Sequence, residues 1–263
     1  MGRKSIISET FGSLWGALIP PDHPRYVSLM YRERLVEKYK EGVVVIQGLI
    51  AHGRGEAFDY ILGERTIPPA ERAERAAAAL LKLAKRPVIS VNGNTAALVP
   101  RELVELSKAL NAPLEVNLFY RSEERAKKIA DLLKAHGAEE VLWEPDWELE
   151  GLSSERRKVS KRGIANADVV LVALEDGDRT EALRRLGKKV IAIDLNPLSR
   201  TARMADITVV DNVIRAIPNI TKFVKQMSSE EAEETLYTFD NIRNLKDSIK
   251  WIKKWLDQAL DLL

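Results

Sequence analysis

The sequence predicts an α/β fold with a Rossmann-like, mostly parallel sheet flanked by helices, a helical N-terminal region and a long C-terminal helix. From Pro87 onward, short apolar runs alternate with helical stretches. This pattern is typical of a parallel sheet with helices on both faces. An Ala- and Glu-rich stretch precedes the runs, and apolar residues recur in steps of three and four after Asp240. We expect one compact domain made of an extension (1–20), a helical region packed on the core (21–86), a Rossmann-like nucleotide-binding core (87–226) and a helical tail (227–263).

The region 21–86 is predicted to be helical. A helix is expected from Tyr26 to Lys40, with Gly42 ending it. The stretch from Val43 to Leu62 is ambiguous, because its β-branched beginning favours a strand while the region suits a buried helix equally well. Pro68 to Arg86 combines a proline in the first turn with Glu, Ala and Leu, which predicts a helix.

The region 87–226 is predicted to hold the sheet. Strands are expected at its short apolar runs, which are Val88 to Val91, Leu114 to Phe119, Val141 to Trp143, Val169 to Leu174, Val190 to Ile193 and Ile207 to Val210. Helices are expected between and after them, at Arg101 to Leu110, Ser122 to His136, Ser154 to Arg162, Thr180 to Leu186 and Asp211 to Gln226. The tail carries an apolar seam with heptad spacing, made of Ile242, Leu245, Ile249, Ile252, Leu256, Ala259 and Leu263. That seam fits a helix packed on its own domain or a contact between two subunits.

Composition excludes several kinds of chemistry. The 263 residues include 41 Lys and Arg against 39 Asp and Glu, a net charge of +2, so we expect neither nucleic acid nor a membrane as a partner. The absence of cysteine rules out thiolate nucleophiles and Cys-ligated metals, and three histidines make a His-based metal cage unexpected. No apolar stretch is long enough to span a bilayer. A cytoplasmic, heat-adapted protein is expected.

Ligands of open α/β sheets bind outside the carboxyl ends of the strands. Here polar residues follow nearly every predicted strand, although ordinary turns also favour Asn, Asp and Gly. Neither GxGxxG after a strand nor GxxxxGK[ST] is present, which argues against an ordinary dinucleotide dehydrogenase and against a P-loop. A bound nucleotide would then depend on arginines and helix N-termini for its phosphates.

Some segments fit that requirement. The run from His52 to Glu56 places Arg54 between two glycines, and Ser199-Arg200-Thr201 opens a helix after a strand. Their alternative interpretations are a helix–helix corner and a simple N-cap. Asp194-Leu195-Asn196 suits hydrogen bonds to a ribose or base. Glu175 and Asp178 lie on an acidic loop that fits either Mg²⁺ or a solvated turn.

Long motifs in chain order resemble those of the archaeal phosphopantothenate synthetases, or 4-phosphopantoate–β-alanine ligases. The motifs lie between about Ile19 and Pro218 and include the segments 19–33, 48–60, 90–94, 115–119, 174–179, 194–201 and 210–212. The resemblance implies a reaction in which 4-phosphopantoate and β-alanine are joined with ATP, giving AMP and diphosphate through an acyl-adenylate, on the route to coenzyme A. It also implies a homodimer.

The same resemblance implies which residues bind ATP, and these are Arg32, Arg54, Asp194, Leu195, Asn196, Arg200, Thr201, Asn212 and Val213. Arg54 and His52 are the candidates for a catalytic role. Substrate candidates are Arg25, Asn94, Asn117, Arg121 and Arg179, and Mg²⁺ would be held by Glu175 and Asp178. An NAD-dependent Rossmann enzyme and a non-catalytic nucleotide sensor are the alternatives.

Overall fold

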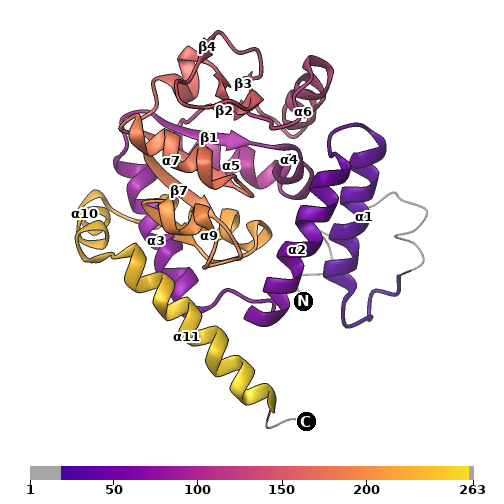
Figure 1. The fold of residues 1–263 in the computed structure, drawn as a ribbon, viewed down its shortest axis with the longest axis vertical. Coiled ribbons are helices and arrows are strands. Elements are labelled where there is room, and N and C mark those ends of the chain that lie inside the picture. Colours follow the sequence, from indigo (N-terminus) through magenta and orange to yellow (C-terminus); the bar gives the residue numbers. More distant parts are fainter. Residues whose placement is uncertain (1–18, 261–263) are drawn as a thin grey trace.

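A computed structural model describes residues 19–260 of the chain. Its main sheet is parallel throughout, with the strand order β3-β2-β1-β6-β7-β8 (Figure 1). The strands are β1 (Pro87–Val91), β2 (Leu114–Val116), β3 (Val141–Leu142), β6 (Val169–Ala173), β7 (Lys189–Ile193) and β8 (Ile207–Val209). The first strand, β1, lies in the middle of the sheet; the chain then builds one edge and returns to build the other, which is the winding of a Rossmann sheet. The predicted α/β fold is confirmed.

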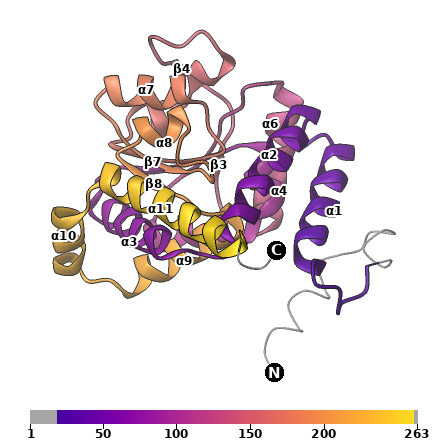
Figure 2. The same cartoon turned by 60° about the horizontal axis from the view of Figure 1, so that its bottom comes forward.

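Helices cover both faces of the sheet, and two more helices stand beyond its carboxyl edge (Figures 1 and 2). The helices are α1 (Tyr26–Lys40), α2 (Ile46–Leu62), α3 (Pro68–Leu83), α4 (Gly93–Leu98), α5 (Pro100–Leu110), α6 (Glu123–Ala135), α7 (Gly177–Arg185), α8 (Arg200–Met204), α9 (Val213–Gln226), α10 (Ser229–Thr238) and α11 (Asn241–Leu260). The arrowhead of β1 points toward α4 and α2, so these helices lie where a Rossmann sheet binds its ligands.

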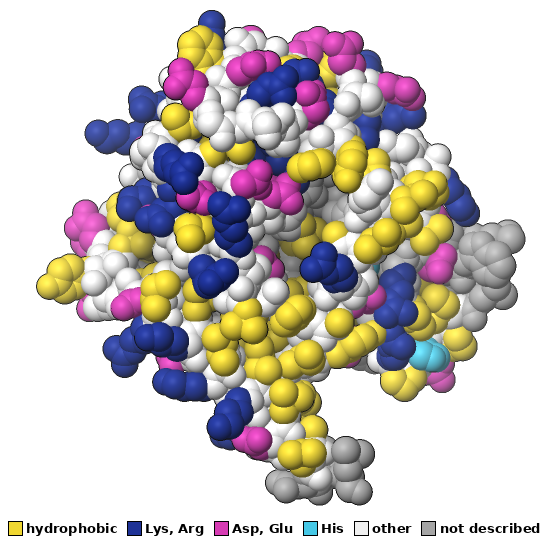
Figure 3. Space-filling view, in the orientation of Figure 1, with side chains coloured by type: hydrophobic (Ala, Val, Ile, Leu, Met, Phe, Trp, Pro, Cys, Tyr) yellow, Lys and Arg dark blue, Asp and Glu magenta, His cyan; other side chains and the backbone are white. Residues whose placement is uncertain are grey.

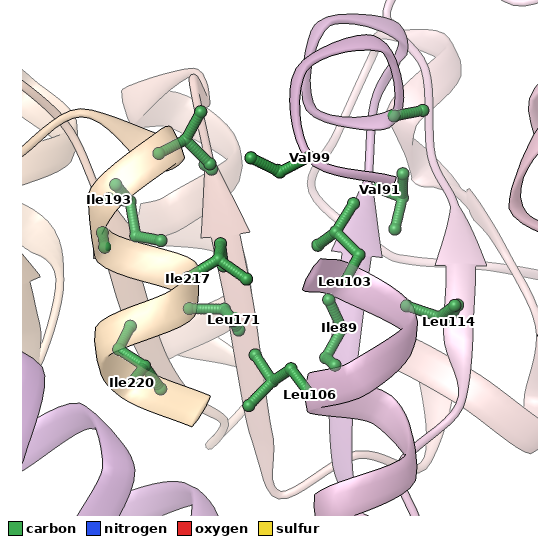
Figure 4. Close-up of a cluster of buried hydrophobic side chains, with 14 of the residues drawn as sticks. Ile89, Val91, Val99, Leu103, Leu106, Leu114, Leu171, Ile193, Ile217 and Ile220 are labelled. Carbon is green, nitrogen blue, oxygen red and sulfur yellow. The ribbon is translucent and has the colours of Figure 1, made fainter. Parts of the chain in front are cut away.

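Two apolar layers sandwich the strands. On one face Ile89, Leu171 and Ile193 pack against Leu103 of α5 and Ile217 of α9 (Figure 4). On the other face alternate residues of the same strands, among them Val88, Val170 and Val190, pack in one cluster with Leu183 of α7. Because both faces are covered, the strands are apolar at consecutive positions rather than at every second one.

The helix predicted from Ser154 to Arg162 is wrong. This segment contains a short turn (Glu155–Arg157), then β5 (Lys158–Val159), which pairs antiparallel with β4 (Trp147–Glu148), and then a π-type turn (Lys161–Ala165). Glu115 of β2 is the cause, because its buried carboxylate accepts the backbone N–H groups of Ser160 at 3.0 Å and Ile164 at 2.6 Å. Gly163 permits this approach, since a Cβ there would lie 1.9 Å from Glu115 Oε2.

The ambiguous stretch after Gly42 resolves as a loop followed by a helix. Val43 and Val44 are buried in the loop, and both of their N–H groups donate to the carbonyl of Lys38. The chain is helical from Ile46 to Leu62, and Gly63 ends α2 with a φ of 88°.

The tail forms the long helix α11, which projects from the body of the molecule (Figure 1). Leu245 of the predicted seam is buried beside Leu62 and Ile67, whereas Ile242 and Leu256 remain about half exposed. Leu263 lies outside the described residues. Part of the seam therefore packs on its own domain, and part of it is open. No helix within residues 19–260 combines the length and apolarity that a membrane span needs.

A buried carboxyl group on α3 makes stability depend on pH. Burial, and then the neighbouring charge of Asp211, raises the pKa of Glu74 to about 9, and Asn219 donates to its Oε2 at 3.0 Å. Between pH 4.5 and about 9, the folded chain holds a proton that the unfolded chain has released. The stability contributed by this group therefore falls as the pH rises through that window.

We predict that Glu74→Gln stabilises the protein, because the amide imitates the protonated carboxyl and removes the titration. The gain in melting temperature over the wild type should grow between pH 5 and pH 9. It should amount to roughly 2–4 °C for each kcal/mol of penalty removed. Thermal unfolding at several pH values measures this difference, and a gain that stays constant with pH would contradict the assignment.

Candidate active site

Helix α2 lies across the carboxyl edge of the sheet and makes contacts along its length. At one end the carbonyl of Gly48 accepts a hydrogen bond of 2.8 Å from Asn94, and a Cβ at position 48 would lie 2.3 Å from Asn94 Oδ1. In the middle Gly55 faces Leu195, whose Cδ1 would be 3.4 Å from a Cβ at position 55. We call the carboxyl end of a strand and the residues that directly follow it the exit of that strand. These glycines let the helix approach the exits of β1 and β7 closely.

The far end of α2 is held by charge. The buried Asp59 accepts a hydrogen bond of 2.8 Å from Asn212, the residue that caps α9. It also forms an ion pair of 2.5 Å with Arg215, which Asp211 shares. A buried carboxylate with these partners is costly to disrupt, because it would leave uncompensated charges behind. The position of α2 relative to the sheet is thus fixed at both ends.

A pocket of about 370 Å³ opens between α2 and the exits of the central strands, and we call it the crevice. Its polar lining includes Gln47 and Arg54 of α2, Asn92 and Asn94 at the exit of β1, Arg125 of α6, Arg156, and Asp176 beyond β6. Its apolar lining includes Val45, Ala51, Leu118, Phe119, Tyr120 and Leu174. The space-filling view of this face shows a hollow near its centre, bordered by basic, acidic and apolar side chains (Figure 3). The crevice lies where the winding of the sheet reverses, between β1 and β6, which is the usual ligand position.

Most of the residues predicted to bind ATP lie at the exits of β7 and β8, whereas Arg32 and Arg54 lie on α1 and α2. Asp194 accepts from the backbone N–H of Asn196 at 2.9 Å and from the Ser199 hydroxyl, and burial raises the pKa of its carboxyl. Thr201 donates to the carbonyl of Glu175 at 2.8 Å, which ties this loop to the exit of β6. The other predicted ATP-binding residues at these two exits lie at separate positions. Leu195 faces α2, Arg200 pairs with Glu181, and Asn212 and Val213 begin α9.

His52 and Arg32 lie on the other side of α2. There a pocket of about 200 Å³ forms between α1, α2 and the start of α9. His52 lines it, and burial lowers the pKa of the imidazole, which is therefore neutral at neutral pH. Arg32 of α1 binds both carboxylate oxygens of Glu56, at 2.9 and 3.0 Å, and donates to the Tyr60 hydroxyl. Arg54 faces the crevice instead, and no group within residues 19–260 pairs with its guanidinium.

The exit of β6 is built around Glu175. Leu174 adopts a φ of 52°, a left-handed backbone conformation that residues other than glycine rarely adopt and that often marks a functional turn. Glu175 then pairs with Arg156 at 2.9 Å and with Arg179, and only 2% of its side chain is exposed. Asp178 is exposed on the first turn of α7. Glu175 is thus occupied by two guanidinium groups, and residues 19–260 contain no cluster of three His, Cys, Asp or Glu that would hold a metal.

The predicted substrate residues do not all meet. Asn94 lines the crevice. Arg25 lies beside Tyr60 in the α1–α2 pocket, and Arg121 donates to the carbonyl of Trp143 in an outer groove. Asn117 is buried beneath the segment 156–158, where it donates to the carbonyls of Arg156 and Lys158. Arg179 is completely buried, so its position suits a support for Glu175 rather than a contact with a ligand.

Arg125 and Arg156 line the crevice and were not among the candidates. Arg156 lies in the segment for which a helix was wrongly expected, so its direction could not be inferred. Arg125 lies in the first turn of α6. This helix was predicted correctly, but its sequence pattern does not show which part of the molecule its first turn faces. One sequence feature that could have indicated the fold of the segment around Arg156 was Glu115, a charged residue inside an apolar run. Burial raises the pKa of its carboxyl to about 7, and its hydrogen bonds hold the turn that follows Arg156 and β5.

Known proteins resemble this chain over most of its length. The family model for phosphopantothenate/pantothenate synthetase matches residues 69–255. A 4-phosphopantoate–β-alanine ligase of Thermococcus kodakarensis is 57% identical over 92% of this chain and 95% of that protein. Ligases of the same name from Methanosarcina mazei and Methanospirillum hungatei are 54% and 49% identical, over 90% and 93% of this chain and 95% and 100% of their own lengths. With matches of this length and identity, the chain belongs to the phosphopantothenate/pantothenate synthetase family.

Proposed function

We propose that this chain is an ATP-dependent ligase of coenzyme A biosynthesis that joins the carboxylate of 4-phosphopantoate to the amine of β-alanine. ATP is split to AMP and diphosphate through an acyl-adenylate. The observation that carries the proposal is the match to proteins named 4-phosphopantoate–β-alanine ligase over 90–93% of the chain. Those names favour a ligase over an NAD-dependent enzyme or a nucleotide sensor.

The chemistry explains why ATP is needed. A carboxylate does not condense with an amine in water, because its oxygen is a poor leaving group. Attack of a carboxylate oxygen on the α-phosphorus of ATP expels diphosphate and forms a mixed anhydride. The β-alanine nitrogen then attacks the activated carbonyl carbon, the C–O bond to AMP breaks, and the nitrogen loses a proton. AMP keeps one oxygen that came from the substrate carboxylate.

The protein must bring two anions together and balance the charge that develops at phosphorus. Arg54, which no group among residues 19–260 pairs with, lines the crevice from α2, and this suits it to the phosphates of ATP. Arg200, at the start of α8, is oriented by Glu181, and Arg32, on the other side of α2, is oriented by Glu56. In this proposal Asp194, Leu195, Asn196 and Thr201 hold the nucleotide at the β7 exit, and Asn212 and Val213 hold it at the β8 exit.

Several further features belong to the same proposal. Mg²⁺ enters with ATP, bound by phosphate oxygens and water, because two arginines engage Glu175 and residues 19–260 contain no cluster of three His, Cys, Asp or Glu. His52 is neutral and faces away from the crevice, which favours a role in fixing α2. The exposed part of the α11 seam provides a surface for a homodimer. A cytoplasmic location fits a chain without cysteine.

Replacement of Arg54 by alanine tests the proposed role of its side chain. We expect kcat/KM to fall roughly 100- to 1000-fold, as when one preorganised donor to a transition state is removed. The melting temperature should stay within about 1 °C of the wild type, since an exposed arginine without partners contributes little to stability. The matched control is Arg86→Ala at the opposite edge of the sheet, where the side chain donates to the Asn166 carbonyl. Equal activity of both variants would remove Arg54 from the site.

An isotope experiment tests the acyl-adenylate. 4-Phosphopantoate labelled with ¹⁸O in its carboxylate should transfer one labelled oxygen to AMP in each turnover. Mass spectrometry of the nucleotide product measures the transfer. Unlabelled AMP would contradict the adenylate. The appearance of ADP with label in inorganic phosphate would indicate an acyl-phosphate instead.

A further inference from the structure

Arg125 is a half-buried cation that has no counter-charge within the described part of the chain. It projects from the first turn of α6 toward the exit of β1. Its Nε donates to the carbonyl of Val43 at 2.9 Å and its Nη1 to the carbonyl of Tyr120 at 2.7 Å. Both partners are neutral, and no carboxylate within residues 19–260 forms an ion pair with it. These two bonds fix the guanidinium in place and leave its charge uncompensated.

The neighbouring charges make this arrangement costly in the absence of a ligand. Arg156 lies on the same wall of the crevice, but Glu175 and Asp176 already balance it, at 2.9 and 3.1 Å. Burial, and then the charge of Arg156, lowers the pKa of Arg125 to about 10. Arg54, which also lines the crevice, likewise has no partner among residues 19–260. The uncompensated charge of the crevice therefore lies at Arg54 and Arg125.

The backbone keeps the free side of Arg125 accessible at the floor of the crevice. A Cβ at Gly93 would lie 2.5 Å from Arg125 Nη2, so a larger residue at position 93 would displace the guanidinium. Beside it, Leu118 and the partly exposed Phe119 and Tyr120 give the crevice an apolar wall. A ligand suited to this pocket has a strong anion at one end and a compact hydrocarbon portion next to it.

We propose that Arg125 binds the phosphate group of 4-phosphopantoate, with the dimethyl-bearing carbon chain of that substrate packed against the apolar wall at Leu118 and Phe119. The inference rests on the proposed function and assigns its substrate phosphate to the crevice. Guanidinium groups hold phosphate through paired, charge-assisted hydrogen bonds, and Arg125 has a free nitrogen for them. The nucleotide occupies the separate exits of β7 and β8, and Arg54 on α2 lies between the two anions.

The test is steady-state kinetics of Arg125→Gln and Arg125→Lys, followed through AMP formation. For Arg125→Gln we expect KM for 4-phosphopantoate to rise about 10- to 100-fold, as expected for loss of a charge-assisted hydrogen bond, and KM for ATP to change less than about twofold. Arg125→Lys should recover part of the loss. Pantoate, which lacks the phosphate, should react equally poorly with wild type and Arg125→Gln. The matched control is Arg157→Gln, since Arg157 pairs with Glu148 and Glu155 outside the crevice.

Two outcomes would overturn the assignment. One is an unchanged KM for 4-phosphopantoate in folded Arg125→Gln, and the other is a rise confined to ATP, which would assign Arg125 to the nucleotide. If the variants fail to fold, the wild type decides. Inorganic phosphate should inhibit competitively against 4-phosphopantoate and not against ATP, and the reverse pattern would contradict the proposal.

A wild type that makes no AMP from the three substrates would reject the proposed function itself. In that case, modification of Arg125 by phenylglyoxal would be measured by mass spectrometry with and without inorganic phosphate. Protection by phosphate would still support an anion site at Arg125, and a lack of protection would reject that site.

Discussion

The site depends on one constraint, the docking of α2 across the carboxyl edge of the sheet. Asp59 fixes one end of the helix to Asn212 and Arg215, and the Gly48 carbonyl fixes the other end to Asn94. Between these anchors the helix turns an open Rossmann edge into two pockets, one on each side. The helix also carries Arg54, its one arginine or lysine, to the crevice at the exits of the central strands.

The arginines near this edge fall into two groups according to their partners. Some have a carboxylate partner and act as parts of the framework: Arg156 and Arg179 hold Glu175, and Arg215 holds Asp59. Arg54 and Arg125 have none among residues 19–260, although the folding of the chain places both against one crevice. Two uncompensated guanidinium groups at one pocket are unfavourable in an empty protein and favourable once anions bind. A reaction in which the carboxylate of a phosphate-bearing substrate attacks ATP needs that distribution of charge.

The amino-acid sequence was sufficient for the sheet and for most of its helices, because buried parallel strands appear as apolar runs and the helices between them keep their periodicity. It failed between Ser154 and Arg162, where side chains distant in sequence, Glu115 and Asn117, capture the backbone groups that a helix would pair internally. Residues on strand exits could be proposed as site candidates from topology alone. Whether an arginine such as Arg179 or Arg125 is neutralised by a neighbour depends on tertiary contacts, and no local pattern encodes them.

The most direct test is a crystal structure of the protein with 4-phosphopantoate and a non-hydrolysable ATP analogue. The nucleotide should lie at the exits of β7 and β8, next to Asp194 and Asn212. The substrate phosphate should lie in the crevice against Arg125, and its carboxylate should face the α-phosphorus beneath Arg54. A nucleotide bound away from these exits, or a complex in which α2 has left the edge of the sheet, would contradict the account.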